Sequence, residues 1–170
     1  SVKLAKAGMS IDLGGIAKGY AVDEVRAIFA KHHIENGLIN LGASSMYALG
    51  SNAKGGPWRI GIKHPRNDDK DTYLGIVAVS NENISTSGDY ERFFEENGVR
   101  YHHIFDPKTG RPARSGVMSD SVLVDSSIEH GGMLGDMLTT ILFVLGPERG
   151  MEFAHSVNGV EAMITTTDGK

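Results

Sequence analysis

Two neighbouring histidines precede a short acidic turn, and these side chains are of the types that transfer protons. His102 and His103 lie near the end of a β-rich run (99–105), and Asp106 and Pro107 begin the turn that follows. Asp and Pro both favour turns, so we expect His103 and Asp106 at the mouth of a strand, within reach of a ligand. An imidazole titrates near neutrality, which suits a general base. The alternative is a plain hairpin end with two surface histidines.

A carboxyl and a hydroxyl one helical turn apart form a second candidate site. Asp136 and Thr140 lie four residues apart in the segment 133–145, whose apolar residues predict a helix. Carboxylate and hydroxyl oxygens are hard ligands that suit Mg²⁺ better than zinc. The alternative is that Asp136 caps the helix while Thr140 bonds back to a carbonyl.

The glycine-rich stretch 12–20 predicts an anion site at the start of a helix. Helical spacing of apolar residues continues to residue 33, and Asp12 is the expected N-cap. Free amides at a helix start attract negative charge, and Lys18 adds a mobile positive charge. The spacing matches neither a Walker loop nor the Gly-x-Gly-x-x-Gly fingerprint, so the signal for phosphate is weak by itself.

A fourth candidate site is a polar group that follows a strand directly, in the segment Ser85-Thr86-Ser87-Gly88-Asp89-Tyr90. Hydroxyls, a glycine and a carboxylate at a strand end can line a pocket for a polar ligand. An ordinary Ser/Gly turn is the alternative.

The composition and the order of elements predict one α+β domain with a largely antiparallel sheet. The chain has 170 residues. It contains no cysteine, which excludes disulfides. Its net charge of -4 argues against a nucleic-acid surface. No apolar run approaches the ~18 residues that span a bilayer. We expect helices at 12–33, 133–145 and 148–156, strands at 38–41, 45–51, 58–63, 73–80, 84–87, 99–105, 121–125 and 160–166, and a charged loop at 66–71. Periodicity leaves 89–96 open between a strand and a helical turn.

Taken in this order, the segments resemble the ApbE family of flavin transferases. The matching stretches cover nearly the whole chain: IDLGGIAKGYAVDEV (11–25), LINLGA (38–43), WRIGIKHP (58–65), ISTSGDYERFFEENGVRYHHIFDPKTGRPA (84–113) and DMLTTILFVLGPERG (136–150). The block 84–113 is long and specific, which argues against chance agreement there.

The resemblance implies an Mg²⁺-dependent enzyme that transfers FMN from FAD to a Thr or Ser hydroxyl of a target flavoprotein subunit and releases AMP. Two alternatives stay open. One is an FAD pyrophosphatase that yields FMN and AMP, and the other is a non-catalytic flavin-binding module.

The family pattern also implies roles for individual residues. For the metal it implies the Gly15 carbonyl, Asp136, Thr140 and the neighbouring Thr139. For FAD it implies Asp12, Lys18, Ser87, Gly88, Asp89, Ile104 and Phe105. His103 corresponds to the functional histidine, and Asp106 or Asp89 is expected to orient it.

Members of the family are longer than this chain. We therefore expect residues 1–170 to form a single domain that is a fragment of a longer catalytic domain, without its amino-terminal half. Because the family is usually exported and often lipid-anchored, we expect a periplasmic or cell-surface location, with any membrane attachment through an upstream anchor.

Overall fold

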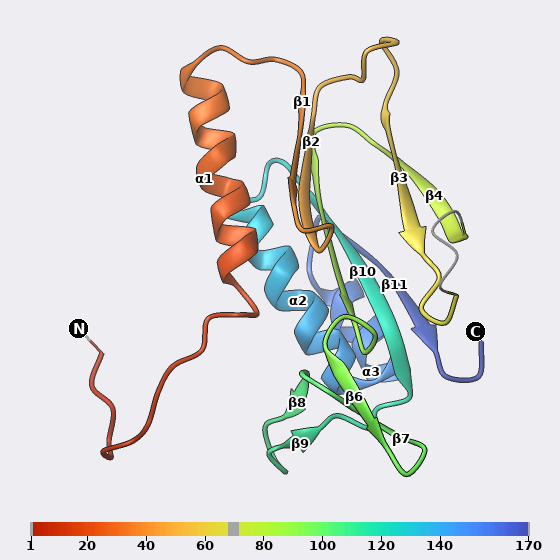
Figure 1. The fold of residues 1–170 in the computed structure, drawn as a ribbon. Coiled ribbons are helices and arrows are strands. Elements are labelled where there is room, and N and C mark those ends of the chain that lie inside the picture. Colours follow the sequence, from red (N-terminus) through yellow and green to blue (C-terminus); the bar gives the residue numbers. More distant parts are fainter. Residues whose placement is uncertain (1, 68–71, 170) are drawn as a thin grey trace.

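A computed structural model describes residues 2–67 and 72–169, and it shows a sheet with helices on one face and a β-hairpin on the other (Figure 1). Its elements are α1 (Ala17–Lys31), β1 (Gly37–Leu41), β2 (Ser45–Leu49), β3 (Trp58–Lys63), β4 (Tyr73–Val79), β5 (Glu82–Gly88), β6 (Phe93–Glu96), β7 (Val99–His102), β8 (Phe105–Asp106), β9 (Arg111–Pro112), β10 (Val117–Asp125), α2 (Gly131–Leu145), α3 (Pro147–Ser156) and β11 (Val160–Thr166). Of the expected loop 66–71, residues 68–71 lie outside the described part of the chain.

The main sheet has the order β1-β2-β5-β10-β11, and every neighbouring pair is antiparallel. Three further antiparallel pairs, β3–β4, β6–β7 and β8–β9, stand outside it. The prediction of an α+β fold with a largely antiparallel sheet is therefore confirmed.

Two apolar cores lie on opposite faces of this sheet, because alternate residues of a strand point to opposite sides. The core against α2 and α3 contains Val122, Val124, Leu138, Leu142 and Ala154. The core against the β3–β4 hairpin contains Met46, Ala48, Ile60, Ile62, Val79 and Ile84.

The first helix begins five residues later than predicted. Asp12 does not cap it; instead, the Asp12 carboxylate accepts a hydrogen bond of 2.7 Å from the Gly14 amide in a local turn. The residue before the helix is Ile16, which has no side-chain cap. An Asp two residues before an amide often forms such a turn, and here this contact replaces the cap.

The prediction of one continuous strand over residues 99–105 is also wrong. The strand β7 ends at His102, and the backbone then turns so that the Ile104 carbonyl accepts a hydrogen bond of 2.9 Å from Ala113. Phe105 and Asp106 form the short strand β8. This break separates the environments of the two histidines. The undecided segment 89–96 contains the strand β6.

The described part of the chain has no helix that is long and apolar enough to cross a membrane.

Candidate active site

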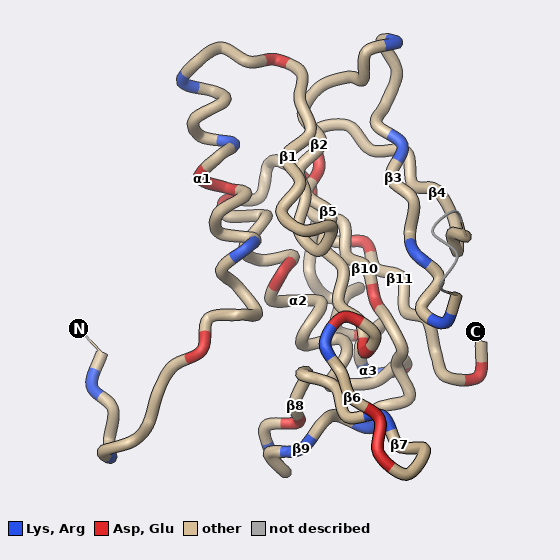
Figure 2. Tube along the Cα trace, in the orientation of Figure 1, with Lys and Arg blue, Asp and Glu red and all other residues tan. Residues whose placement is uncertain are grey.

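Asp136 lies where α2 crosses α1. Its side chain is only 6% exposed, and Oδ2 accepts a hydrogen bond of 3.0 Å from the Gly19 amide of α1. Asp136 is the one charged residue of α2 (Figure 2). Because Oδ2 already has a partner, Oδ1 is the carboxylate oxygen that remains for a cation.

Two glycines allow α1 and α2 to approach this closely. A Cβ added to Gly19 would lie 2.1 Å from the Gly132 carbonyl oxygen, and one added to Gly132 would lie 2.6 Å from the Gly19 carbonyl oxygen. Real side chains do not tolerate such distances. The glycines at this crossing therefore set the distance between the two helices.

Asp23, which the sequence analysis did not single out, caps α2 from α1. Its two carboxylate oxygens accept hydrogen bonds of 2.9 Å each from the Gly132 and Met133 amides. These are donors that a helix start leaves free. The cap explains why α2 begins at Gly131, two residues before the predicted start. No local sequence signal marks this cap, because the amides that Asp23 accepts lie 109 and 110 residues further along the chain.

Thr140 lies next to the turn before α1. A Cβ added to Gly15 would lie 3.3 Å from Thr140 Oγ1, so a side chain at this position would crowd that hydroxyl. Both residues line a hollow of about 240 Å³. Its lining residues are Asp12, Leu13, Gly15, Ile16, Met137, Thr140 and Ile141.

Three of the residues expected at the metal thus converge from two segments far apart in the sequence. Asp136 and Thr140 lie one turn apart on α2, Gly15 lies beside the Thr140 hydroxyl, and the Gly19 amide of α1 bonds to the Asp136 carboxylate. Among the described residues, no three His, Asp or Glu side chains are grouped as a metal site. A cation here would depend on hard oxygen ligands, which fit Mg²⁺.

Thr139 points to the sheet instead. It is fully buried, its hydroxyl donates to the Asp136 carbonyl at 2.8 Å, and it accepts a hydrogen bond of 2.8 Å from Ser87 Oγ on β5. Both hydroxyls therefore join α2 to the sheet. Gly88, the next residue, has the Tyr90 ring against it, with 2.4 Å between that ring and an added Cβ.

The two residues expected to contact FAD near α1 are exposed. Lys18 lies in the first turn of α1, and its Nζ donates to the Ser44 hydroxyl in the turn between β1 and β2. Asp12 lies in the wall of the hollow beside Thr140. The Lys18 ammonium and the Asp12 carboxylate are therefore both exposed near the start of α1.

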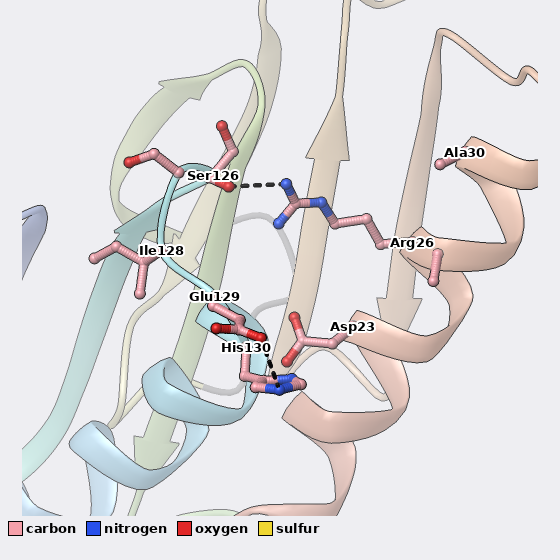
Figure 3. A pocket seen from close by; sticks show the side chains of 9 residues that line it. Asp23, Arg26, Ala30, Ser126, Ile128, Glu129 and His130 are labelled. Atoms are coloured by element: carbon pink, nitrogen blue, oxygen red, sulfur yellow. Dashed lines mark hydrogen bonds and ion pairs between the residues drawn. The ribbon is translucent and has the colours of Figure 1, made fainter.

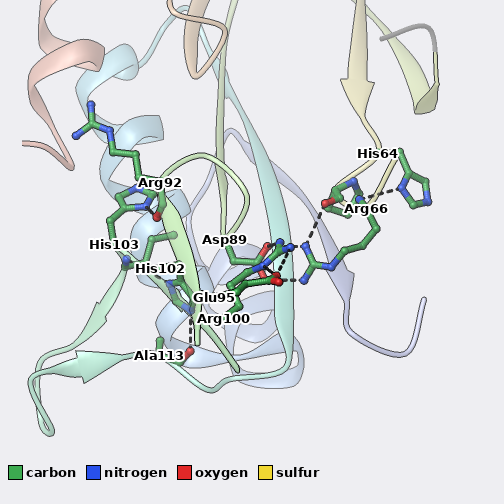
Figure 4. Close-up of polar contacts among 11 residues, drawn as sticks. His64, Arg66, Asp89, Arg92, Glu95, Arg100, His102, His103 and Ala113 are labelled. Atoms are coloured by element: carbon green, nitrogen blue, oxygen red, sulfur yellow. Dashed lines mark hydrogen bonds and ion pairs between the residues drawn. The ribbon is translucent and has the colours of Figure 1, made fainter. Parts of the chain in front are cut away.

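His103 is exposed, and the backbone orients its ring (Figure 4). Its Nδ1 lies 3.3 Å from the Arg92 carbonyl oxygen, which also accepts the His103 amide at 3.1 Å. A carbonyl only accepts, so Nδ1 carries the hydrogen in this contact and Nε2 is left as a proton acceptor. Sequence reasoning did not identify Arg92, because its contribution is a backbone carbonyl.

The two carboxylates expected to orient His103 have other partners. Asp106 accepts a hydrogen bond of 2.8 Å from the Lys108 amide within its own turn. Asp89 is buried and accepts two hydrogen bonds of 2.6 Å from Arg66, with Arg100 at 3.4 Å (Figure 4). The contact with Asp89 raises the pKa of the Arg66 guanidinium.

The residues on either side of His103 are buried. His102 lies with Nε2 3.0 Å from the Ala113 carbonyl oxygen, and its Nδ1 accepts the Ile104 amide at 3.3 Å. Burial lowers the pKa of His102 and thereby favours its neutral form. Ile104 is buried with it, whereas the Phe105 ring is 55% exposed and available to a ligand.

A second hollow of about 290 Å³ lies at the other end of α1 (Figure 3). Here Arg26 donates to the Ser126 carbonyl at 2.8 Å, and its guanidinium lies over the Tyr47 ring. The remaining lining residues are Asp23, Ala27, Ala30, Ser127, Ile128, Glu129 and His130. None of the residues expected to bind FAD or metal line this hollow.

Comparison with solved structures places this arrangement in one class of fold. The ApbE protein of Thermotoga maritima matches with a TM-score of 0.82 and 37% identity, over 96% of this chain and 51% of that one. The flavin transferase ApbE of Vibrio cholerae matches with a TM-score of 0.76 and 38% identity, over 94% of this chain and 48% of that one.

The chain belongs to the ApbE family, whose sequence model matches residues 1–164. The FAD:protein FMN transferase of Klebsiella pneumoniae is 38% identical over 166 residues, which are 98% of this chain and 48% of that protein. The protein of the same name from Treponema pallidum is also 38% identical, over 99% of this chain and 47% of its own length. The chain thus spans about half the length of the relatives it matches.

Proposed function

We propose that this chain carries the cation-binding and proton-transferring part of an Mg²⁺-dependent FAD:protein FMN transferase. The observation on which the proposal rests is the convergence of Gly15, Asp136 and Thr140 at the α1–α2 crossing. Membership of the ApbE family and the names of the relatives support the substrate, FAD, and a protein acceptor.

The residues that would hold the cation are Asp136 through Oδ1, Thr140 through its hydroxyl and Gly15 through its carbonyl. Mg²⁺ bound there would neutralise the pyrophosphate of FAD and the charge that develops as AMP leaves. Lys18 adds a positive charge at the same opening, where an anionic phosphate is favoured.

His103 is the proposed base. Its Nε2 would take the proton from a Thr or Ser hydroxyl of the acceptor flavoprotein subunit. The hydroxyl oxygen then forms a bond to the phosphorus of the FMN half, and the pyrophosphate bond to AMP breaks. The exposed ring of Phe105, with the backbone of Ile104 beside it, is the proposed surface for the cofactor's rings. We further propose that the protein acts outside the cytoplasm, in the periplasm or at the cell surface.

An assay of AMP release with FAD, Mg²⁺ and an acceptor protein tests the proposal, with covalent flavin on the acceptor as its second readout. Asp136→Ala should lower AMP release at least about a hundredfold, because it removes the charged ligand. His103→Ala should lower it by about a hundredfold or more, as expected when a general base is lost. Glu148→Ala, in the first turn of α3, is the control and should leave the rate unchanged.

Hydrolysis of FAD is a second candidate, because His103 is exposed and water can reach Nε2. Free FMN formed without an acceptor would identify this activity. Saturable FAD binding without AMP at any Mg²⁺ concentration would instead indicate a non-catalytic flavin-binding module, and the proposal would be wrong.

A further inference from the structure

The helix α2 begins with residues that support a helix poorly. Three of its first five residues are the glycines Gly131, Gly132 and Gly135, and glycine is the weakest helix former after proline. The residue before the helix, His130, has a left-handed backbone and no side-chain cap of its own. The first turn also carries no acidic residue. The start of α2 therefore needs support from elsewhere in the fold.

Close packing explains why these glycines are present. A Cβ added to Gly131 would lie 2.7 Å from the Asn83 side chain, and one added to Gly132 would lie 2.6 Å from the Gly19 carbonyl oxygen. A better helix former would collide with the sheet or with α1. The start of α2 is thus a compromise between close packing and helix stability. Asp136 follows it directly, as the sixth residue of the helix.

A polar stripe on α1 supplies this support. Its residues Gly19, Asp23 and Arg26 lie at positions i, i+4 and i+7, so they share one face of the helix. Figure 3 shows Asp23 and Arg26 extending from α1 toward the segment that leads into α2. Arg26 donates a hydrogen bond of 2.8 Å to the Ser126 carbonyl in the loop before α2. Each residue of the stripe contacts a different part of the segment 126–136.

The two helices exchange carboxylate contacts where they cross. Asp23 of α1 accepts the Gly132 and Met133 amides at 2.9 Å each. One turn further along α2, Asp136 accepts the Gly19 amide of α1 at 3.0 Å. A carboxylate at a helix start pairs with donors that would otherwise be free, and it suits the positive end of the helix dipole. The turn of α2 that ends at Asp136 is therefore attached to α1 at both of its ends.

We propose that Asp23 is a positioning residue of the cation site, because its cap on α2 sets the place of the turn that presents Asp136 and Thr140 to Mg²⁺. This role rests on the proposed function, and Asp23 acts through α2 rather than as a ligand of the cation. Mg²⁺ demands near-ideal geometry from its ligands, so a small displacement of their helix should weaken its binding. In a variant of Asp23, Asp136 and Thr140 keep their own side chains and only their position changes.

Calorimetric titration of the chain with Mg²⁺ tests the positioning. Asp23→Ala removes the cap and should weaken Mg²⁺ binding by about tenfold, the effect typical of losing a group that orients a ligand. Glu24→Ala is the matched control, because it removes the same charge from the next residue of α1, whose side chain is exposed. This control should stay within about twofold of wild type. An equal loss of Mg²⁺ affinity in both variants would overturn the proposal, because it would reflect charge rather than position.

A parallel titration with Ca²⁺ gives a readout that a loss of stability alone would not change. Ca²⁺ accepts irregular coordination at longer distances than Mg²⁺ does. A displaced α2 should therefore weaken Mg²⁺ binding more than Ca²⁺ binding. In Asp23→Ala the preference for Mg²⁺ over Ca²⁺ should fall by about threefold or more. A ratio of the two dissociation constants that stays at the wild-type value would contradict the positioning role.

A milder variant keeps the test decisive if Asp23→Ala does not fold. Asp23→Asn retains one acceptor oxygen of the same shape, so half of the cap remains. It should weaken Mg²⁺ binding by about threefold, less than the complete loss of the cap. Urea unfolding establishes that each variant is folded under the conditions of the titration.

The outcomes separate the two proposals. Unchanged Mg²⁺ binding in the folded Asp23 variants contradicts the positioning role and leaves the proposed function intact. A wild-type chain that binds no Mg²⁺ contradicts the proposed function and the positioning role together.

Discussion

At the scale of single residues, two adjacent histidines show how the backbone divides chemical roles. His102 ends β7 and points inward, where both ring nitrogens contact the main chain. His103 is exposed, with Nδ1 held by the Arg92 carbonyl. The side chains are identical, so the break in the strand after His102 decides which imidazole is exposed to solvent.

The buried imidazole should make stability depend on pH. The pKa of His102 is lowered in the folded protein by burial, so below about pH 6.5 the unfolded chain binds a proton that the folded chain does not. The free energy of unfolding is therefore highest above pH 6.5, as far as His102 determines it, and falls as the pH drops toward the pKa of His102 in the folded protein. Urea unfolding between pH 5 and 8 should show this slope in wild type and lose it in His102→Asn. His155→Asn on α3 is the control, and an identical slope in His102→Asn would contradict the assignment.

At the scale of elements, the α1–α2 crossing assembles the site. Asp23 caps α2, Gly19 donates to Asp136, and the facing glycines permit the contact. The sequence predicted both helices and the Asp136/Thr140 pair, because helical spacing is a local property. It did not predict the Asp23 cap, because the amides that Asp23 accepts lie far away in the sequence. It also did not predict the late start of α1, because Asp12 forms a turn with Gly14 in place of the expected N-cap.

Gly19→Ala should test how tightly this crossing is packed. The added methyl would meet the Gly132 carbonyl oxygen at 2.1 Å, and backbone cannot move away as a flexible side chain can. We expect a loss of about 1–3 kcal/mol or more in the free energy of unfolding. Gly75→Ala on β4 is the matched control, since nothing lies within 4 Å of its added Cβ. Equal effects of the two substitutions in urea would show that the helices separate easily.

At the scale of the whole molecule, Asp89 joins three parts of the chain outside the helices. Its carboxylate contacts Arg66, which follows β3, and Arg100 on β7, while Asp89 itself follows β5. The sequence marked Asp89 as a polar group at a strand end but offered no means to choose its partners. Those arginines lie in other hairpins, and only the tertiary fold brings them to one carboxylate.

Asp89→Asn should lower the free energy of unfolding by about 1–2 kcal/mol. The buried carboxylate has two cationic partners, but the Arg66 side chain is 35% exposed, so solvent weakens the interaction. The loss should shrink when urea unfolding is repeated in 1 M salt, which screens the pair. Glu95→Gln, whose more exposed carboxylate contacts Arg100, should change stability by less than about 0.5 kcal/mol. A larger loss in the free energy of unfolding for Glu95→Gln than for Asp89→Asn would contradict this prediction.

The cap on α2 also determines when the molecule can be completed during synthesis. Asp23 and the amide it accepts at Gly132 are 109 residues apart, so α1 leaves the ribosome long before its partner exists. An isolated helix of 15 residues is marginal in water, and α1 therefore gains its main support only when α2 arrives. The α1–α2 crossing therefore cannot form before residues 131–145 have left the ribosome.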